Sequence, residues 1–460
     1  MTVTLVLTDA LADELSAAAV ADVETAGVLI ARYVATPSGH VRLLGRRIHW
    51  VPEDAYLERE SDRLSIASSG YVHALADAEH EGSIAIWLHT HPGNGSSPRP
   101  SRHDRVVDEQ LADLFRLRAD ADHYAAVVVA HRDGQLRFAG HLESEGERAD
   151  IGRLWITGSR LQLAYNATHD AALLPEEFDR NIRAFGGDIQ RVLGDLSVSV
   201  IGAGGTGSAV AEQLVRLGVQ RLHLLDPEEL SGSNVTRVYG STPADIGRPK
   251  VDILAAHLQR IAPDAELTTT KGMVTEEANA RALLDADVVF GCTDDNAGRL
   301  VLSRVASYLL TPVIDCGVLL SSGPTGQLQG IDGRVTVLAP GAACLVCRGR
   351  VDLARAAAEM MTPEEHNRLA GEGYAPALAG TEPAVVTYTT QVAAAAVSEL
   401  VERLVHYGPN PAPSEILLRM HEREISTNEA LPRDGHYCDP AADKFGCGIV
   451  NPFLEQTWRS

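Results

Sequence analysis

Basic residues are scarce in this chain relative to acidic ones. Its 460 residues include 40 lysines and arginines against 62 aspartates and glutamates, which gives a formal net charge of −22. A surface of this sign repels phosphate backbones and anionic lipid headgroups. The charge is spread along the sequence rather than gathered in one tail. We therefore expect a protein with no nucleic-acid partner and no membrane partner.

Long apolar runs and cysteines are also few. We find no uninterrupted apolar stretch of the roughly 18 residues that a membrane span requires. Residues 2–15 contain acidic residues where a secretory signal would have a basic segment followed by an apolar one. Six cysteines in a chain of this length are typical of a reducing compartment. These features predict a cytoplasmic protein.

The length of the chain predicts two or three domains, because one hydrophobic core rarely serves 460 residues. Residues 1–150 alternate short β-type runs with helical stretches and predict a compact α/β domain. Residues 151–174 are polar and mixed, which is typical of a connector. In residues 175–424, apolar runs alternate with helices and predict a Rossmann-like domain with a mostly parallel sheet and right-handed crossovers. Residues 425–460 are expected to be a loop-rich tail.

Particular strands and helices follow from the same periodicities. Helices are expected at 106–117, 209–217 and 385–404. Strands are expected at 41–44, 84–88, 125–130, 198–201, 221–225, 287–290, 311–314 and 415–420.

Residue types that bind metals follow the expected strand at 84–88. His89 and His91 would project to the same side if that strand continues, because side chains alternate along a strand. Neutral imidazoles are the usual zinc ligands, and a third protein ligand leaves one position for water. Asp104 is the candidate for that third ligand, with His103 as an alternative. Zinc bound here would lower the pKa of its water towards neutrality.

A hydrolytic site also needs a proton acceptor and a donor to the developing oxyanion. Glu24 is the candidate acceptor, and Ser101 is the candidate donor. The segments Glu24-Thr25-Ala26-Gly27, His-Thr-His-Pro and Ser-x-x-Asp occur in this order. Together they resemble the JAB/MPN (JAMM) metalloprotease family over about the first 145 residues.

This resemblance implies a fold, a reaction and a set of roles. Members cleave peptide or isopeptide bonds after the C-terminal glycine of ubiquitin-like proteins. The implied roles are zinc binding by His89, His91 and Asp104, general-base catalysis by Glu24 and oxyanion stabilisation by Ser101. The sequence departs from the family in having nine residues, rather than the usual seven, between His91 and Ser101. A segment rich in Gly, Ser and Pro, residues 93–100, would absorb the difference.

A glycine-rich loop, Val200–Ser208, follows one expected strand and precedes an expected helix. In that context the free amides and the dipole of a helix N-terminus bind phosphate. Asp226, after the next expected strand, is placed to bond ribose hydroxyls, which would also suit a dinucleotide-binding domain. The glycines assigned to this loop are Gly202, Gly204, Gly205 and Gly207.

Charged residues downstream favour chemistry at an α-phosphate over hydride transfer. Arg237 and Lys250 would neutralise triphosphate charge, and Asp294 would hold Mg²⁺, which prefers hard oxygen ligands. This set resembles the ThiF/MoeB adenylyltransferase family, the core of ubiquitin-activating enzymes, from about residue 176 to residue 420.

This second resemblance implies that ATP adenylates the C-terminal carboxylate of a ubiquitin-like or sulfur-carrier protein. It places Asn234 on the phosphates with Arg237 and Lys250, and it adds Asn296 to the nucleotide-binding set. Arg180 matches the arginine finger that reaches the site of a partner subunit, so a homodimer is expected. Val238 stands where the family usually has glutamine.

Four cysteines match a structural zinc site of the same family. Cys344 and Cys347 form a Cys-x-x-Cys pair, and Cys438 and Cys447 lie in the tail, separated by eight residues where the family usually has two. Four thiolates at tetrahedral geometry suit zinc. The alternative is two free buried pairs. Cys292 and Cys316 are interpreted as packing residues.

No cysteine occurs in residues 371–386, where many relatives carry the thiol that receives the activated carboxylate. A thiolate is the natural acceptor for an adenylate, because it is nucleophilic near neutral pH. We therefore expect a downstream conjugating protein to supply the nucleophile, with Thr381 as an alternative acceptor.

The sequence as a whole predicts a bifunctional enzyme serving one ubiquitin-like modifier, with ATP, Mg²⁺, a catalytic zinc ion and a structural zinc ion as cofactors. Activation of a sulfur carrier for cofactor or cysteine synthesis is one alternative. A non-catalytic scaffold with a degenerate site is a second, and an NAD-dependent oxidoreductase is a third.

Overall fold

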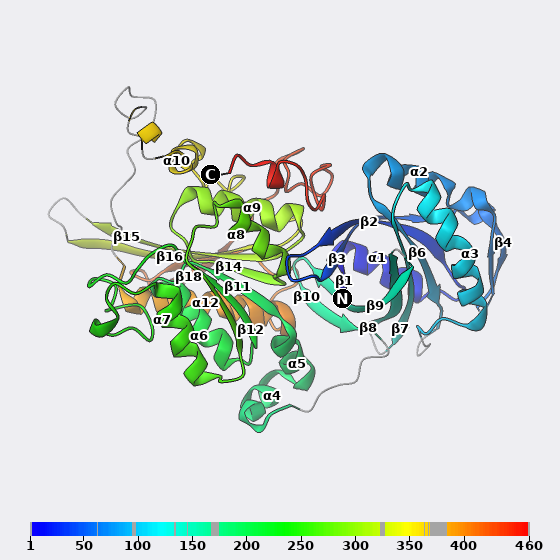
Figure 1. Ribbon diagram of the computed structural model, residues 1–460. Helices are drawn as coiled ribbons and strands as arrows, with labels where there is room; N and C mark the ends of the chain where they lie inside the picture. Colours follow the sequence, from blue (N-terminus) through cyan, green and yellow to red (C-terminus); the bar gives the residue numbers. More distant parts are fainter. Residues whose placement is uncertain are drawn as a thin grey trace. The chain divides into compact units, whose positions relative to one another are not determined.

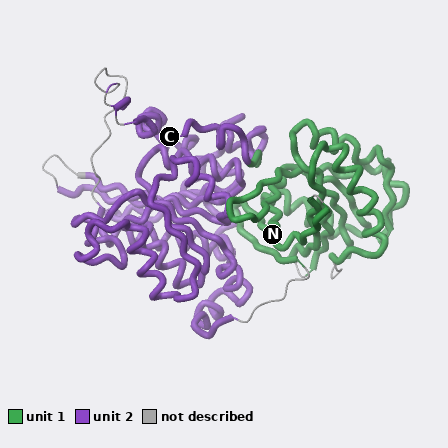
Figure 2. Tube along the Cα trace, in the orientation of Figure 1, with its two compact units in different colours: residues 1–171, 446–448 green, residues 172–445, 449–460 purple. Residues whose placement is uncertain are grey.

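The computed structural model describes residues 2–61, 63–93, 98–132, 135–144, 146–166, 174–322, 327–362, 364–366, 368 and 384–458. The chain forms two compact units (Figure 2). The first comprises Met1–Ala171 with Gly446–Gly448, and the second comprises Ala172–Phe445 with Ile449–Ser460. Among the described helices, none is long and apolar enough to cross a membrane.

The first unit is built on an eight-stranded sheet of order β1-β3-β2-β6-β7-β8-β9-β10. Because β1 also pairs with β9, this sheet closes on itself. A two-stranded sheet, β4-β5, lies apart from it in the hydrogen-bonding scheme. The strands are β1 (Val3–Thr8), β2 (Ala26–Ala35), β3 (Val41–Trp50), β4 (Tyr56–Arg59), β5 (Leu64–Ile66), β6 (Ile84–His91), β7 (His123–Arg132), β8 (Gln135–Ser144), β9 (Glu147–Thr157) and β10 (Leu161–Tyr165).

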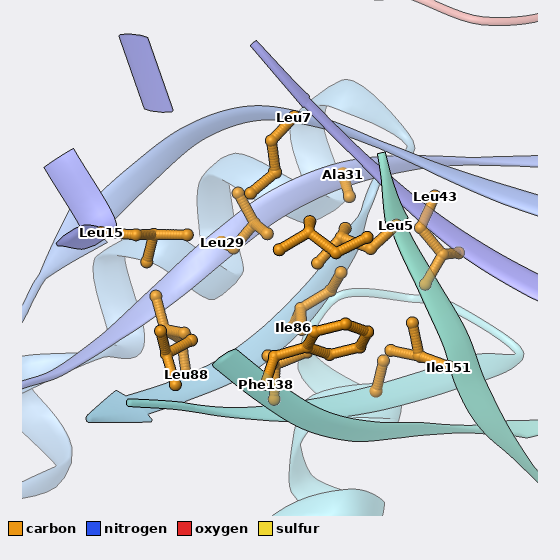
Figure 3. Packing of buried hydrophobic residues seen from close by; sticks show 14 of the residues in the cluster. Leu5, Leu7, Leu15, Leu29, Ala31, Leu43, Ile86, Leu88, Phe138 and Ile151 are labelled. Atoms are coloured by element: carbon orange, nitrogen blue, oxygen red, sulfur yellow. The ribbon is translucent and has the colours of Figure 1, made fainter. Parts of the chain in front are cut away.

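Apolar side chains of this sheet divide between two cores, one on each face, because successive residues of a strand point to opposite sides. In β6, Ile86 and Leu88 join the core that includes Leu15 of α1 (Asp9–Ala19), as Figure 3 shows. Trp87 joins the other core, with residues of α2 (Val72–Glu81) and α3 (Arg102–Arg118). Because side chains alternate along β6, His89 and His91 lie on the same side of the strand as Trp87, which is the side of α3.

The stretch expected to be a connector, residues 151–174, contains the second half of β9 and all of β10, so that prediction and the boundary at residue 150 are wrong. β9 pairs in parallel with β1 through Leu5↔Leu154 and Leu7↔Ile156, and all four side chains are buried. The alternating apolar residues of this stretch therefore complete the first core. Residues 167–173 lie outside the described residues.

The second unit contains an eight-stranded sheet of order β13-β12-β11-β14-β15-β16-β17-β18 (Figure 1). The pairings from β13 to β15 are parallel, as expected, but those from β15 to β18 are antiparallel. The strands are β11 (Ser197–Ile201), β12 (Arg221–Leu225), β13 (Glu266–Thr270), β14 (Val288–Gly291), β15 (Val313–Ser322), β16 (Leu328–Leu338), β17 (Glu415–Arg419) and β18 (Glu424–Asn428).

The helices of the second unit include α6 after β11 and the 20-residue helix α12, close to the expected 385–404. β12 and β14 flank β11, so the chain reverses its direction of winding beside the end of β11. Ligands of open α/β sheets bind at such a switch point. The helices are α4 (Asp179–Phe185), α5 (Gly187–Asp195), α6 (Gly205–Arg216), α7 (Lys250–Ile261), α8 (Glu277–Ala282), α9 (Asn296–Tyr308), α10 (Leu353–Glu359) and α12 (Val386–Val405).

Candidate functional sites

The structure brings His89, His91 and Asp104 together in the first unit. β6 continues to His91, so the two imidazoles share one side of the strand. Nε2 of His89 lies 3.7 Å from Oδ1 of Asp104, and Nε2 of His91 lies 3.4 Å from Oδ2. One ligand atom from each residue lies within 4.8 Å of the others, a spacing that one metal ion can bridge. The exposed His103 is not a member of this group.

A capping box fixes Asp104 in the first turn of α3. The amide of Asp104 donates to Oγ of Ser101 (3.1 Å), and the amide of Ser101 donates to Oδ2 of Asp104 (2.6 Å). Burial opposes ionisation of Asp104, but the imidazoles of His89 and His91 outweigh it and lower the pKa of this carboxyl. Ser101 acts as an acceptor in the box, so its O–H is still available as a donor.

Glu24 lies next to the histidines through strand pairing. Ala26 is opposite His89 in the β2–β6 ladder, and Thr25 continues the pairing with two bonds to Thr90. The Glu24 side chain is buried, with 7% of its surface exposed. This short loop before β2 therefore carries a carboxylate at the end of the sheet where the metal-ligand candidates lie.

A second buried polar group in the first unit was not found by sequence reasoning. Asp108 and His141 are 8% and 4% exposed, and Oη of Tyr124 donates to Oδ1 of Asp108 at 2.6 Å. Nη2 of Arg148 lies 3.0 Å from Nδ1 of His141. The members of this buried group come from three strands and a helix, so their proximity cannot be read from the sequence. The only signal was the spacing of Asp104 and Asp108, which lie one helical turn apart and place Asp108 near the metal-ligand candidates.

In the second unit, the glycine-rich loop joins β11 to the N-terminus of α6. Gly202 has a φ of +97°, which favours glycine. A Cβ on Gly207 would lie 1.7 Å from the carbonyl oxygen of Gly202, so the helix can approach the loop only with glycine at this position. This tight turn leaves the first amides of α6 at the carboxyl edge of the sheet, where anions bind.

Asp226 holds this loop from the end of β12. Its Oδ2 accepts from the amide of Ala203 at 2.7 Å, and its Oδ1 accepts from the amide of Glu228 at 2.8 Å. Burial raises the pKa of Asp226, although Lys250 and the two amides act in the opposite direction. Nζ of Lys250 contacts Oε2 of Glu228. Asp226 and Lys250, assigned to ribose and phosphate, are thus linked to one another through Glu228.

The remaining nucleotide-site candidates differ in how far their side chains are already engaged. Nη1 of Arg237 donates to the carbonyl of Ser233 (2.9 Å), and its stem packs against Gly205 at the start of α6. Oδ1 of Asn234 accepts from the amide of Ser231 (3.2 Å). Arg237 therefore lies beside the glycine-rich loop, whereas Asn234 shapes the turn that precedes Arg237 in the sequence.

Asp294 and Asn296 follow β14 on the other side of the loop. Asp294 is exposed, as a Mg²⁺ ligand needs to be before nucleotide binds. Asn296 instead bonds within the protein, because its Oδ1 accepts from the amide of Asp352 at 2.9 Å and its Nδ2 donates to Glu359 at 3.4 Å. The oxygen and the nitrogen of the Asn296 side-chain amide thus both bond to α10 or to the residue before it.

Arg180 lies exposed on the short helix α4. Exposure suits a side chain that acts on another subunit, the role implied by the sequence.

The structure gathers three of the four expected zinc-binding cysteines, with a histidine as the fourth member. Cys344, Cys347, His436 and Cys438 each offer a ligand atom within 4.8 Å of the others. Sγ of Cys347 lies 3.6 Å from Sγ of Cys438, and Nδ1 of His436 lies 3.2 Å from the same sulfur. Cys447 is not in this group and is grouped with the first unit.

Cys344 and Cys438 share one proton in this group. The hydrogen bond from Cys438 outweighs burial and lowers the pKa of Cys344 to about 5, while the same bond raises the pKa of Cys438 well above its usual range. Deprotonated sulfur is the form that ligates zinc. The eight-residue gap before Cys447, unusual for the family, is explained if His436 takes its place, and the His-x-Cys spacing was the signal that sequence reasoning missed.

The remaining cysteine predictions fall in two places. Cys292 directly follows β14 and Cys316 lies within the neighbouring β15, and their mutual hydrogen bond, together with burial, raises the pKa of Cys292 well above its usual range. Such a thiol is unreactive, which suits the packing interpretation. Most of residues 371–386, including Thr381, lies outside the described residues.

Comparison with known proteins identifies relatives of the second unit. The ThiF family matches residues 178–438, a stretch that lies within that unit and does not reach the first. The sulfur carrier protein ThiS adenylyltransferase of Escherichia coli K12 is 35% identical over 153 residues, which are 33% of this chain and 57% of that protein.

Two further similarities are weaker. Ubiquitin-like modifier-activating enzyme 5 of Oryza sativa is 29% identical over 167 residues, covering 33% of this chain and 38% of the relative. The chain thus spans about half the length of these curated relatives. A crystal structure of E. coli MccB with ATP superposes with a TM-score of 0.44 at 15% identity, covering 57% of this chain and 73% of that one.

Proposed function

This chain belongs to the ThiF family, and on that premise we propose that it is a bifunctional enzyme of a ubiquitin-like modification pathway. The second unit adenylates the C-terminus of a ubiquitin-like protein with ATP. The first unit cleaves peptide or isopeptide bonds after that C-terminus with the aid of zinc. The first part is supported by the family match, and the second by the grouping of His89, His91 and Asp104.

The observation that carries adenylation is the loop at Gly202–Gly207, held against Asp226 beside the Arg237 stem. Its amides would bind the phosphates, while Arg237 and Lys250 neutralise their charge. The carboxylate of the carrier protein then bonds to the α-phosphorus, and the bond from that phosphorus to pyrophosphate breaks. Mg²⁺ at Asp294 would supply further neutralisation of the leaving group.

The residues of the first unit suit hydrolysis. Zinc held by His89, His91 and Asp104 would lower the pKa of a bound water molecule. Glu24 accepts the proton that water loses on attack and returns it to the leaving amine. The O–H of Ser101 donates to the oxyanion that develops on the scissile carbonyl. The buried setting of Glu24 and His89 strengthens these electrostatic effects.

A downstream conjugating protein would receive the activated carboxylate, since residues 371–386 contain no cysteine. Arg180 would act across a homodimer interface. Sulfur transfer is the second candidate, because a relative is named as an adenylyltransferase of a sulfur carrier. Formation of a carrier thiocarboxylate from sulfide would favour that candidate, whereas attachment to a protein lysine would favour conjugation.

The two activities are tested with reciprocal variants. ATP–pyrophosphate exchange that depends on a carrier protein reports adenylation, and release of a C-terminal extension from the same carrier reports cleavage. Asp294→Ala should abolish exchange and preserve cleavage, whereas Glu24→Ala should do the reverse. Loss of both activities in either variant would contradict two independent sites, and a wild-type protein without exchange would support the scaffold alternative.

A further inference from the structure

The buried group around Asp108 lies next to the three metal-ligand candidates. Oδ1 of Asp108 accepts from Tyr124 (2.6 Å), and its Oδ2 lies 3.2 Å from Nε2 of His141 and 3.7 Å from Nη1 of Arg148. Asp108 follows Asp104 by one turn of α3. A carboxylate on a side chain that is only 11% exposed thus lies one helical turn from a proposed zinc ligand.

One small cavity connects the two groups. His89 and Asp104 of one group and Asp108 and His141 of the other all line it, together with apolar side chains that include Trp87. Its volume is about 20 Å³, and a cavity of at least about 10–15 Å³ accommodates a water molecule when polar partners surround it.

The ring of His89 needs a partner in this cavity. Only 5% of the residue is exposed, and neither ring nitrogen has a hydrogen-bond partner among the residues that the structure describes. Nε2 points towards Asp104, so Nδ1 carries the proton when Nε2 binds a metal ion. An unpaired buried N–H is costly, and histidine ligands almost always donate their second N–H to a carboxylate, a carbonyl or a water molecule.

We propose that Asp108 is a positioning residue of the metal site, accepting the Nδ1 proton of His89 through a water molecule in this cavity. The inference rests on the proposed zinc site. The hydrogen bond from Tyr124 orients the carboxylate, and Arg148 balances its charge. The bridge holds the imidazole with Nε2 towards the metal and raises the basicity of that nitrogen.

A second cation at Asp108, His141 and Glu143 is the competing assignment, because their ligand atoms also lie within 4.8 Å of one another. Arg148 argues against it. Arginine can only donate, so its contact of 3.0 Å with Nδ1 of His141 places the imidazole proton on Nε2. A protonated nitrogen cannot ligate, and the guanidinium, 3.2 Å from Glu143, already supplies the positive charge.

Zinc affinity of the full chain tests the proposal, measured by competition with a chromophoric chelator. Asp108→Asn has the same shape without the charge, and the loss of an outer-shell partner should weaken zinc binding by about 10–100-fold. Asp104→Ala removes a ligand and gives the baseline for zinc held elsewhere. Asp108→Glu retains the charge and should bind zinc more tightly than Asp108→Asn, an order that a purely steric role would reverse.

Glu143→Gln is the matched control, because Glu143 contacts Arg148 but does not line the cavity. It should leave the zinc affinity unchanged. Unchanged affinity in Asp108→Asn, or equal losses in Asp108→Asn and Glu143→Gln, would overturn the proposal. Loss of one whole zinc equivalent from both variants would instead establish the second cation. A chain that binds zinc but cleaves no carrier would contradict the protease while leaving this comparison intact.

Discussion

Ser101 uses one hydroxyl for two purposes, helix capping and the proposed donation to an oxyanion. Ser101→Ala should lower the free energy of unfolding of the first unit by about 1 kcal/mol, the usual cost of losing an N-cap. It should also lower the cleavage rate by about 10²–10³-fold, because one oxyanion donor is lost. Urea unfolding and single-turnover cleavage measure the two effects.

Ser101→Asp separates them, since aspartate caps helices well but, when ionised, cannot donate. It should restore stability without restoring cleavage. Recovery of cleavage in this variant would show that Ser101 acts through the helix alone.

His141 should make the first unit sensitive to mild acid. Burial is the main cause that lowers the pKa of His141 to about 4, against about 6.5 in an unfolded chain. The unfolded state therefore binds the extra proton between these values, and stability is lost as the pH falls from 6.5 towards 4, by up to about 3 kcal/mol.

Urea unfolding of zinc-free protein at several pH values measures this loss. His141→Gln should flatten the pH dependence, whereas His103→Gln, at an exposed histidine, should retain it. An equally steep dependence in His141→Gln would assign the acid sensitivity to other groups.

The sequence predicted which side chains lie close together when they belong to one strand or helix, but not when they come from several elements. His89 and His91 share a strand and Ser101 and Asp104 share a helix turn, so their proximity could be predicted. Asp108 and His141 meet only through sheet packing. His436 was not predicted because four cysteines already matched the zinc site of the family, with Cys447, further along the tail, as the fourth ligand.

At the scale of elements, the loop before α6 depends on one close backbone contact. Gly207→Ala places a methyl group 1.7 Å from the Gly202 carbonyl oxygen. The helix must shift, so we expect a loss of stability of more than about 1 kcal/mol, as for overpacked sites, together with loss of ATP binding. Differential scanning calorimetry and titration with ATP check both.

Gly204→Ala is the control, because no atom lies within 4 Å of the position that its Cβ would take. Its unfolding should match that of the wild type. Equal destabilisation by the two substitutions would mean that the contact at Gly207 does not limit the loop.

Strands with strong apolar patterns were predicted near their observed ends, as at β11 and β12. At the antiparallel edge β17 was also predicted, but β16 and β18 were not, because they contain few of the apolar runs by which buried parallel strands are recognised. The same reason applies to β9, whose polar first half concealed a strand that pairs with β1. These segments form strands because of the strands with which they pair, rather than because of local propensity.

At the scale of the whole molecule, metal content distinguishes the expected cysteine set from the observed group. Full-length protein should contain two zinc ions, one for each unit, measured by plasma emission spectrometry after dialysis. Asp104→Ala and His436→Ala should each remove one ion from a different site.

Cys447→Ser should retain both ions, because the gathered ligands are Cys344, Cys347, His436 and Cys438. Loss of an ion in Cys447→Ser, with retention in His436→Ala, would restore the four-cysteine assignment.

The pairing of β1 with β9 also governs how the chain is made and how it can be cut. Residues near the start of the chain bond to partners about 150 positions later, as Asp9 does to Ser159. Contacts so distant in sequence form late, because the entropy cost of closing a long loop must be met before the contacts can stabilise the fold. During synthesis the first strand therefore has one unpaired edge until β9 leaves the ribosome. A fragment ending at residue 150 would keep that edge exposed and would be prone to pair with other copies.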